Sequence, residues 1–408
     1  MRFLPASAVA AATLFMSCVP TGSVTAAPVP TTVGFKALTV PVRVLDTRDP
    51  ASFDGQSRLN VSSLSVPVRS RAGLSVADSV AVVNVVAVNA TTAGFITVWA
   101  ASPDGSCSTP PVISTTNFVA AGTRANMTLA RIGGLGRICV FSNAEVDVVI
   151  DVTGSMNETG DRFTPVTPTR LVDTRNSGRR TFGTVMRVTA PGPAGMSSVA
   201  VNVTSVHPDT DGFLTVYPAD ASGACQAPPT TSTVNTPAGM IRPGATFVGV
   251  SNNAFCVFWF TGGDVVVDLF GTFSPNGQAT YLAHDVPRRA VDNRSMAGWG
   301  PNFDPGRIQI RSPYGGGILN FNGVEHRLAA YQFNVTAVAA LQAGFMFAAP
   351  YAGTGALQPT TSDTSIGNFA PGEVAANAVV AVPKPSVVVG PSAPSYMVID
   401  ELGVWWET

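Results

Sequence analysis

The chain carries one sequence pattern three times. An Arg-x-x-Asp-Thr-Arg motif at 43–48 returns at 170–175 and, with Asn in place of Thr, at 289–294. Downstream, an Asn landmark and a Gly landmark both recur after 118 residues and again after a further 132. Landmarks that shift together predict that one structural unit is built three times. They are Asn84, Asn202 and Asn334, and Gly94, Gly212 and Gly344; the closing Asp151, Asp268 and Asp400 recur after 117 and 132 residues.

Each copy has the pattern of short β-strands. Segments 79–89 (SVAVVNVVAVN) and 94–100 (GFITVWA) are rich in β-branched and aromatic residues, and a glycine-containing turn separates them. Several strands are apolar on both faces, which suits the inside of packed sheets. No long segment after residue 26 has the apolar spacing of a helix. We therefore predict an all-β chain of three tandem β-sandwich modules, with a jelly roll as one candidate topology.

The first residues have the pattern of a secretory signal. An early arginine precedes a short apolar run, and small residues at 24–26 suit signal peptidase. We expect cleavage after Ala26; lipid attachment at Cys18 is an alternative, although the preceding Phe-Met-Ser is a poor lipobox. No other stretch reaches the ~18 apolar residues of a membrane helix. The predicted organisation is a signal peptide at 1–26, a Pro/Thr leader at 27–39, and modules at 40–156, 162–275 and 281–408.

Four cysteines follow the signal segment, one pair in each of the first two modules. An even count with one pair per repeat, in an exported chain, predicts the disulfides Cys107–Cys139 and Cys225–Cys256. Metal binding would need closely spaced ligands with histidine nearby, so we expect no metal. Each bridge would stabilise its module by ~3–4 kcal/mol in the chain-entropy model. The third module has no cysteine, is more divergent, and is expected to unfold first.

The repeated charged residues allow a functional and a structural interpretation. Arg and Asp side chains could form a binding site, but Asp and Thr also cap strand ends, and Arg pairs with carboxylates within a module. We favour the structural interpretation, because pairing is how such groups tolerate burial. It predicts three ion pairs that join the first strand of a module to its last: Arg48–Asp151, Arg175–Asp268 and Arg294–Asp400.

The mid-strand asparagines are expected to be buried, hydrogen-bonded amides that fix register or brace a loop. Carbohydrate recognition by the same amides is the alternative, because an amide also suits sugar hydroxyls. Four aromatic residues are candidates for ligand binding by stacking, although aromatic side chains more often fill cores. They are Trp99 and Tyr217, at equivalent strand positions, and Trp405 and Trp406 near the C-terminus.

No catalytic motif is found in the sequence. Its three histidines do not recur between modules, and no serine-hydrolase elbow, zinc motif or phosphate loop is present. A catalytic pair without a motif, such as Asp285 with Glu325, is disfavoured. Calcium at Asp209 and Asp211 is disfavoured, because only the glycine of that turn recurs in the other modules. We expect no enzyme activity and no cofactor.

Charge excludes one class of partner. Only 12% of residues are charged, the formal net charge is −1, and no basic block is present. Nothing in the sequence would therefore hold a phosphate backbone, and nucleic acid is not an expected partner. Tandem copies instead suit multivalent binding or mechanical spacing.

Taken together, the R-x-[LV]-D-T-R opening, the N-V-T strand, the G-F-[IL]-T-V-[WY] strand and the closing D-V-x-G resemble repeats of exported actinobacterial proteins. The resemblance covers 40–271 well and 281–404 weakly. It implies an extracellular or envelope location, and no hydrolase domain accompanies the repeats here. We therefore expect a non-catalytic secreted or cell-surface protein that recognises cell-wall or other glycan. The alternatives are a self-associating structural protein of the surface, which contacts other surface proteins, and, less favoured, a hydrolase of unknown type.

Overall fold

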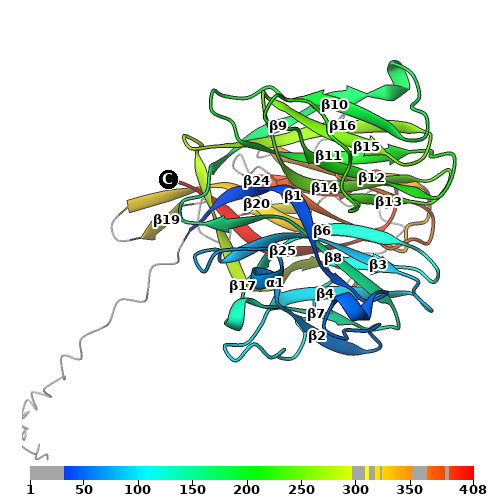
Figure 1. Cartoon of the computed structure of the whole chain (residues 1–408), viewed down its shortest axis with the longest axis horizontal. Helices are drawn as coiled ribbons and strands as arrows, with labels where there is room; N and C mark the ends of the chain where they lie inside the picture. The colour runs from blue at the N-terminus through cyan, green and yellow to red at the C-terminus, as the bar shows by residue number, and fades with distance from the viewer. Residues whose placement is uncertain (1–31, 296–307, 312–317, 322–323, 352–364, 382–385) are drawn as a thin grey trace, which may run out of the picture. The chain divides into compact units, whose positions relative to one another are not determined.

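The computed structural model describes residues 32–295, 308–311, 318–321, 324–351, 365–381 and 386–408. Strands make up most of this part of the chain, and the strand pairs within it are antiparallel (Figure 1). The all-β prediction is therefore confirmed. The predicted signal peptide at 1–26 lies outside the described residues. The described residues form one compact unit.

Eight strands of the first repeat, here called module 1, form two four-stranded sheets. A short helix α1 (Val68–Arg71) and two 3-10 turns, η1 (Pro50–Ser52) and η2 (Gly134–Gly136), connect them. The inner sheet has the order β1 (Gly34–Asp46), β8 (Asp147–Asn157), β3 (Val80–Val88), β6 (Arg124–Arg131). The outer sheet has the order β2 (Ser62–Val66), β7 (Ile138–Ser142), β4 (Gly94–Ala100), β5 (Thr116–Phe118).

Module 2 repeats this order. Its inner sheet is β9 (Arg162–Asp173), β16 (Asp264–Ser274), β11 (Ser198–Val206), β14 (Ile241–Gly249). Its outer sheet is β10 (Thr184–Thr189), β15 (Ala254–Trp259), β12 (Gly212–Pro218), β13 (Val234–Thr236). A 3-10 turn, η3 (Thr174–Asn176), follows its first strand, and the arginine motif ends in this turn.

Module 3 repeats the order again. Its inner strands are β17 (Ala279–Asp292), β25 (Tyr396–Glu407), β20 (Val324–Val338) and β23 (Ala375–Ala381), and β19 (Ile318–Phe321) also pairs with β20. Pairing of β17 with β9 joins them to the inner strands of module 2 in one nine-stranded sheet. The outer sheet of module 3 is β18 (Ile308–Arg311), β24 (Ser386–Pro391), β21 (Gly344–Tyr351), β22 (Gly367–Phe369). The turn η4 (Asn293–Ser295) corresponds to η3.

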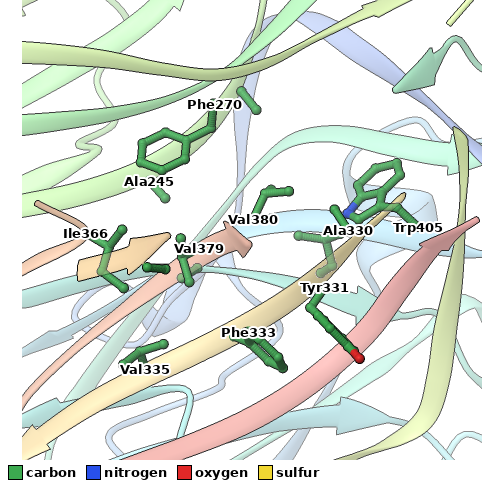
Figure 2. Packing of buried hydrophobic residues seen from close by; sticks show 14 of the residues in the cluster. Ala245, Phe270, Ala330, Tyr331, Phe333, Val335, Ile366, Val379, Val380 and Trp405 are labelled. Atoms are coloured by element: carbon green, nitrogen blue, oxygen red, sulfur yellow. The ribbon is translucent and has the colours of Figure 1, made fainter. Parts of the chain in front are cut away.

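The apolar strand residues fill two kinds of core. In modules 1 and 2, one core lies between the two sheets of the module and contains residues from both. A second core joins inner-sheet residues of all three modules, such as Val82, Phe247 and Tyr331. Figure 2 shows part of this shared core, where Ala245 and Phe270 of module 2 lie among Ile366, Val379, Val380 and Trp405 of module 3. The modules are therefore packed on one another, which a purely tandem arrangement would not require.

The first strands begin earlier than expected. Strand β1 starts at Gly34, inside the segment 27–39 predicted to be a leader, and β17 starts at Ala279 rather than after residue 280. The reason is the shared core, which buries Val33 and Phe35. Backbone pairing also joins the starts of the three first strands: Val33 with Tyr281, Phe35 with Asp161, and Ala279 with Phe163.

The closing glycine of each module is explained by an aromatic ring packed directly against its backbone. A Cβ atom at Gly271 would overlap the ring of Phe163, which extends from the paired first strand. Such close approach of a ring to a strand is possible only without a side chain. The same relationship holds between Gly154 and Phe35, and between Gly403 and Tyr281.

Candidate functional site

The first arginine of each motif pairs with the closing aspartate. In module 1, Arg43 Nε lies 2.8 Å from Asp151 Oδ1, whereas Arg48 turns back onto Asp46 at 2.6 Å. The predicted pairs Arg48–Asp151, Arg175–Asp268 and Arg294–Asp400 are therefore wrong in the choice of arginine. The observed pairs are Arg43–Asp151 (2.8 Å), Arg170–Asp268 (2.5 Å) and Arg289–Asp400 (2.6 Å), while Arg175 and Arg294 pair with Asp173 and Asp292.

Strand register explains this choice. Arg43 stands directly opposite Asp151 in the β1–β8 pairing, so their side chains share one face of the sheet. Arg48 lies beyond the end of β1, where its own backbone N–H donates to Asp46 Oδ1 at 3.1 Å. This is a local turn that holds the second arginine close to the motif aspartate.

The pKa values of the two aspartates that contact each first motif arginine are shifted in opposite directions. Asp151 is 1% exposed, and its burial raises its pKa despite the hydrogen bond from Arg43. Burial acts in the same sense on Asp46, but the hydrogen bonds from Arg48 outweigh it and lower the pKa of that carboxyl. The closing aspartates Asp268 and Asp400 resemble Asp151, and the motif aspartates Asp173 and Asp292 resemble Asp46.

The three mid-strand asparagines join the modules in a cycle. Each is at most 4% exposed and donates from Nδ2 to the main-chain oxygen of an equivalent serine in the next module. That serine precedes the short strand at the end of the outer sheet (β5, β13 or β22), and its Oγ donates to an asparagine three residues on. The prediction of buried, hydrogen-bonded amides is confirmed, but their partners lie in another module. The bonds run from Asn84 to Ser232 (2.5 Å), from Asn202 to Ser365 (3.0 Å) and from Asn334 to Ser114 (2.6 Å).

The arginine–aspartate pairs lie beside these asparagine–serine contacts, which we call the joints between modules. Arg43 also donates to the main-chain oxygen of Thr230 in module 2 at 3.1 Å. In the joint between modules 3 and 1, the backbone N–H of Ser114 donates to Asp400 at 3.4 Å. The repeated polar residues thus serve contacts within and between modules.

A second layer of amides completes two of the three joints. Asn126 Nδ2 donates to Asn334 Oδ1 at 2.8 Å, and Asn377 Nδ2 donates to Asn202 Oδ1 at 2.9 Å. The equivalent position in module 2 is Gly244. Accordingly, the buried Oδ1 of Asn84 has no hydrogen-bond partner among the described residues.

The four aromatic residues proposed for ligand binding are buried, so none forms a surface platform. Trp405 and Trp406 lie in the shared core. Trp99 donates to Ser108 Oγ at 3.1 Å, and Tyr217 donates to the main-chain oxygen of Gln226 at 2.7 Å. Both of these side chains pack beside cysteines of the outer sheets.

Both predicted disulfides are confirmed. The S–S distances are 2.08 Å for Cys107–Cys139 and 2.00 Å for Cys225–Cys256. In module 3 the strand register places Val388 where Cys139 and Cys256 stand in the others.

An exposed aromatic patch on module 2 was missed by the sequence interpretation. Phe213 and Phe260 stack with ring centroids 4.7 Å apart, and Phe182 packs on Phe260 at 5.1 Å. Phe182 is 70% exposed and Phe260 37% exposed. Phe258 lies 6.1 Å from Phe213, and the neighbouring Val185 is 40% exposed. We call Phe182, Phe213, Phe258 and Phe260 the phenylalanine patch.

The patch is a departure from the repeat. The backbone N–H of Phe260 bonds the oxygen of Phe213, as that of Asn143 bonds Phe95 and that of Ser392 bonds Phe345. All three modules therefore have phenylalanine at the position of Phe213. Only module 2 also has it at the position of Phe260. A search for differences between copies, in place of similarities, would have found this signal.

Residues considered for catalysis or metal binding are not brought together. Asp285 forms an ion pair with Arg131, and the side chain of Glu325 lies outside the described part. Asp209 pairs with Arg179, and Asp211 accepts from the backbone N–H of Ala238 at 2.8 Å. The described residues contain no cluster of three metal-ligating side chains. Nor does any helix among them have the length and apolarity needed to cross a membrane.

Comparison with known proteins gives no family. No protein-family model matches the chain, and no curated protein matches it. Among solved structures, one match is to a chain from the atomic structure of Sulfolobus turreted icosahedral virus, at 10% sequence identity. It covers 93% of this chain and 99% of that chain with a TM-score of 0.19, a likeness too small to carry an argument.

Proposed function

We propose that this chain is a non-catalytic binding protein of the cell exterior, which recognises glycan through the phenylalanine patch of module 2. In this proposal the three modules form a scaffold. The order of strands in each pair of sheets supports reading each module as a jelly-roll sandwich. Export is supported by the two disulfides, which persist in oxidising compartments, and by the signal-like first 26 residues.

The observation that carries the proposal is the exposure of the patch. Large apolar side chains grouped on a surface mark interaction sites more often than chance. The face of a sugar ring that carries only C–H groups can stack on an aromatic side chain, and the stacked Phe213 and Phe260 rings provide such a face. Polar partners for hydroxyl groups lie close in sequence, at Thr181 and Thr184.

The repeated polar residues are not available as a ligand site, which also favours the phenylalanine patch. The asparagines and aspartates common to the modules are occupied by contacts within and between modules. The outer sheets of the modules differ at the equivalent positions of Phe260, Asn143 and Ser392. A ligand site is therefore expected where the outer sheets differ, which is where the phenylalanine patch lies.

The test is retention on purified peptidoglycan and on wall polysaccharide. The variant Phe182→Ser/Phe260→Asn removes the two most exposed rings, and its Asn matches Asn143 in module 1. We expect retention to fall about tenfold, equivalent to ~1.4 kcal/mol. The control Val112→Ser removes another exposed apolar side chain, 88% exposed in module 1, and should bind as the parent does. Equal retention of both variants would contradict the proposal.

Self-association is the second candidate, because the patch adjoins an edge strand. Strand β10 carries the exposed Val185 and is the first strand of its sheet. An apolar edge of this kind can pair with another copy. Light scattering distinguishes the two: a mass that rises with concentration in the parent and not in the patch variant, without glycan retention, favours self-association.

A further inference from the structure

A small cavity lies where the three modules meet, and equivalent residues of all three line it. Its volume is about 20 Å³. That is enough for one group of water size, since a cavity of roughly 10–15 Å³ holds a water molecule. The matching lining residues are Asn117, Asn235 and Asn368, and Arg124, Arg242 and Ala375.

Positive charge exceeds negative charge at this cavity. Arg242 Nη2 lies 2.9 Å from Glu373 Oε1, and Arg124 forms an ion pair with the same carboxylate oxygen. The side chains of Arg242 and Glu373 are each 7% exposed, and that of Arg124 is 13% exposed. Within the described part of the chain, no second carboxylate lies within ion-pair distance of either arginine. Two guanidinium groups therefore share one carboxylate.

Further hydrogen-bond donors lie in the same place. The buried Nε of Arg242 has no acceptor among the residues that the structure describes. Each of the three lining asparagines accepts a serine hydroxyl at Oδ1, at 3.0 Å, 3.0 Å and 3.2 Å. Their amide nitrogens are therefore the groups left to donate.

Both arginines remain charged near neutral pH. Burial, with repulsion from Arg242, lowers the pKa of Arg124 to about 9, and burial lowers that of Arg242 to about 10. An unbalanced buried charge is costly, and a bound counter-ion is one way to balance it.

We infer that this cavity binds a monovalent anion of halide size, with chloride as the natural occupant. The excess guanidinium charge selects for an anion, and the asparagine amides complete its coordination by hydrogen bonding. The small size of the cavity favours a single-atom anion over phosphate or sulfate. The anion would stabilise the contact of all three modules, and it is independent of the phenylalanine patch.

The test compares thermal unfolding of the full chain in chloride and in gluconate at equal ionic strength. We expect the melting temperature to be higher in chloride by about 2 °C or more, with saturation as chloride rises. Arg242→Met should abolish this difference. Glu373→Gln leaves two unpaired guanidinium groups and should enlarge it. Arg179→Met removes an exposed arginine that does not line the cavity and should leave it unchanged.

A direct measurement uses the parent protein and does not depend on the variants folding. Crystals grown with bromide in place of chloride should show anomalous scattering at the cavity, within hydrogen-bond distance of Arg242. Equal melting temperatures in the two salts, a chloride effect that survives Arg242→Met, or no bromide at the cavity would each overturn the inference.

Discussion

Asn334 donates a 2.6 Å hydrogen bond to the main-chain oxygen of Ser114, although 220 residues separate them in the sequence. This bond returns the cycle from the third module to the first. Asn84 and Asn202 make the two equivalent bonds in the forward direction. Each bond needs two modules and the complete cycle needs all three, so we expect unfolding to be cooperative across them.

Replacing Asn334 should be costly. Asn334→Ala removes the donor to Ser114 and leaves that buried oxygen and Asn126 with fewer partners. Loss of a buried hydrogen-bond partner typically costs ~1–3 kcal/mol. Asn84→Ala should cost less, because Asn84 Oδ1 has no partner to lose among the described residues. Urea unfolding measures the difference, with the exposed Asn60→Ala as control; equal costs at the two positions would contradict this account.

The incomplete joint at Gly244 can be completed. Asn at this position would reproduce Asn126 and Asn377, but its Cβ would lie 2.6 Å from Val234 Cγ2. Module 3, which carries Asn377, has Gly367 where module 2 has Val234. Gly244→Asn alone should therefore destabilise, by ~1–3 kcal/mol from overpacking. Adding Val234→Ala removes the Cγ2 methyl and should recover stability, and urea midpoints of both variants test this. A double variant no more stable than the single one would show that the missing amide is not what distinguishes this joint.

The sequence was sufficient to predict what depends on local pattern. Strand segments follow from β-branched and aromatic runs, and the disulfides follow from one cysteine pair per repeat. The sequence did not identify which arginine pairs with Asp151, because Arg43 and Arg48 both belong to the motif. Only the strand register places Arg43 opposite this carboxylate. A buried amide at Asn84 predicts that a partner exists, but no local feature of the sequence points to Ser232, 148 residues away. The phenylalanine patch was missed because similarity between copies, rather than difference, was used to select residues.

The closing glycines should tolerate no side chain. Gly271→Ala places a methyl group in the ring of Phe163, and overpacking of this kind costs ~1–3 kcal/mol. If ring contact is the cause, Phe163→Leu should lose less stability in the Gly271→Ala background than in the parent. A double-mutant cycle by urea unfolding measures this coupling. Additive effects of the two substitutions would mean that the glycine is required for another reason.

Acid should weaken the fold through the motif aspartates. The hydrogen bonds from Arg48 hold the pKa of Asp46 below its usual value, in spite of burial. A carboxyl whose pKa is lower in the folded state stabilises the fold above its unfolded pKa of ~3.9, and this contribution is lost as pH falls through the folded pKa. Asp151 has the opposite effect on stability, because burial raises its pKa. Its protonation in mild acid removes a buried charge and therefore stabilises the folded state.

Stability should therefore hold or rise slightly on mild acidification and then fall steeply below about pH 4. Asp46→Asn should flatten the steep part of the curve of urea midpoint against pH. Asp151→Asn should remove the mild-acid effect without removing the later loss, because it eliminates only the group whose pKa is raised. If Asp46→Asn left the acid limb unchanged, the pair with Arg48 would not be the source of the acid sensitivity, and the three equivalent turns would have only a local role in shaping the strand ends.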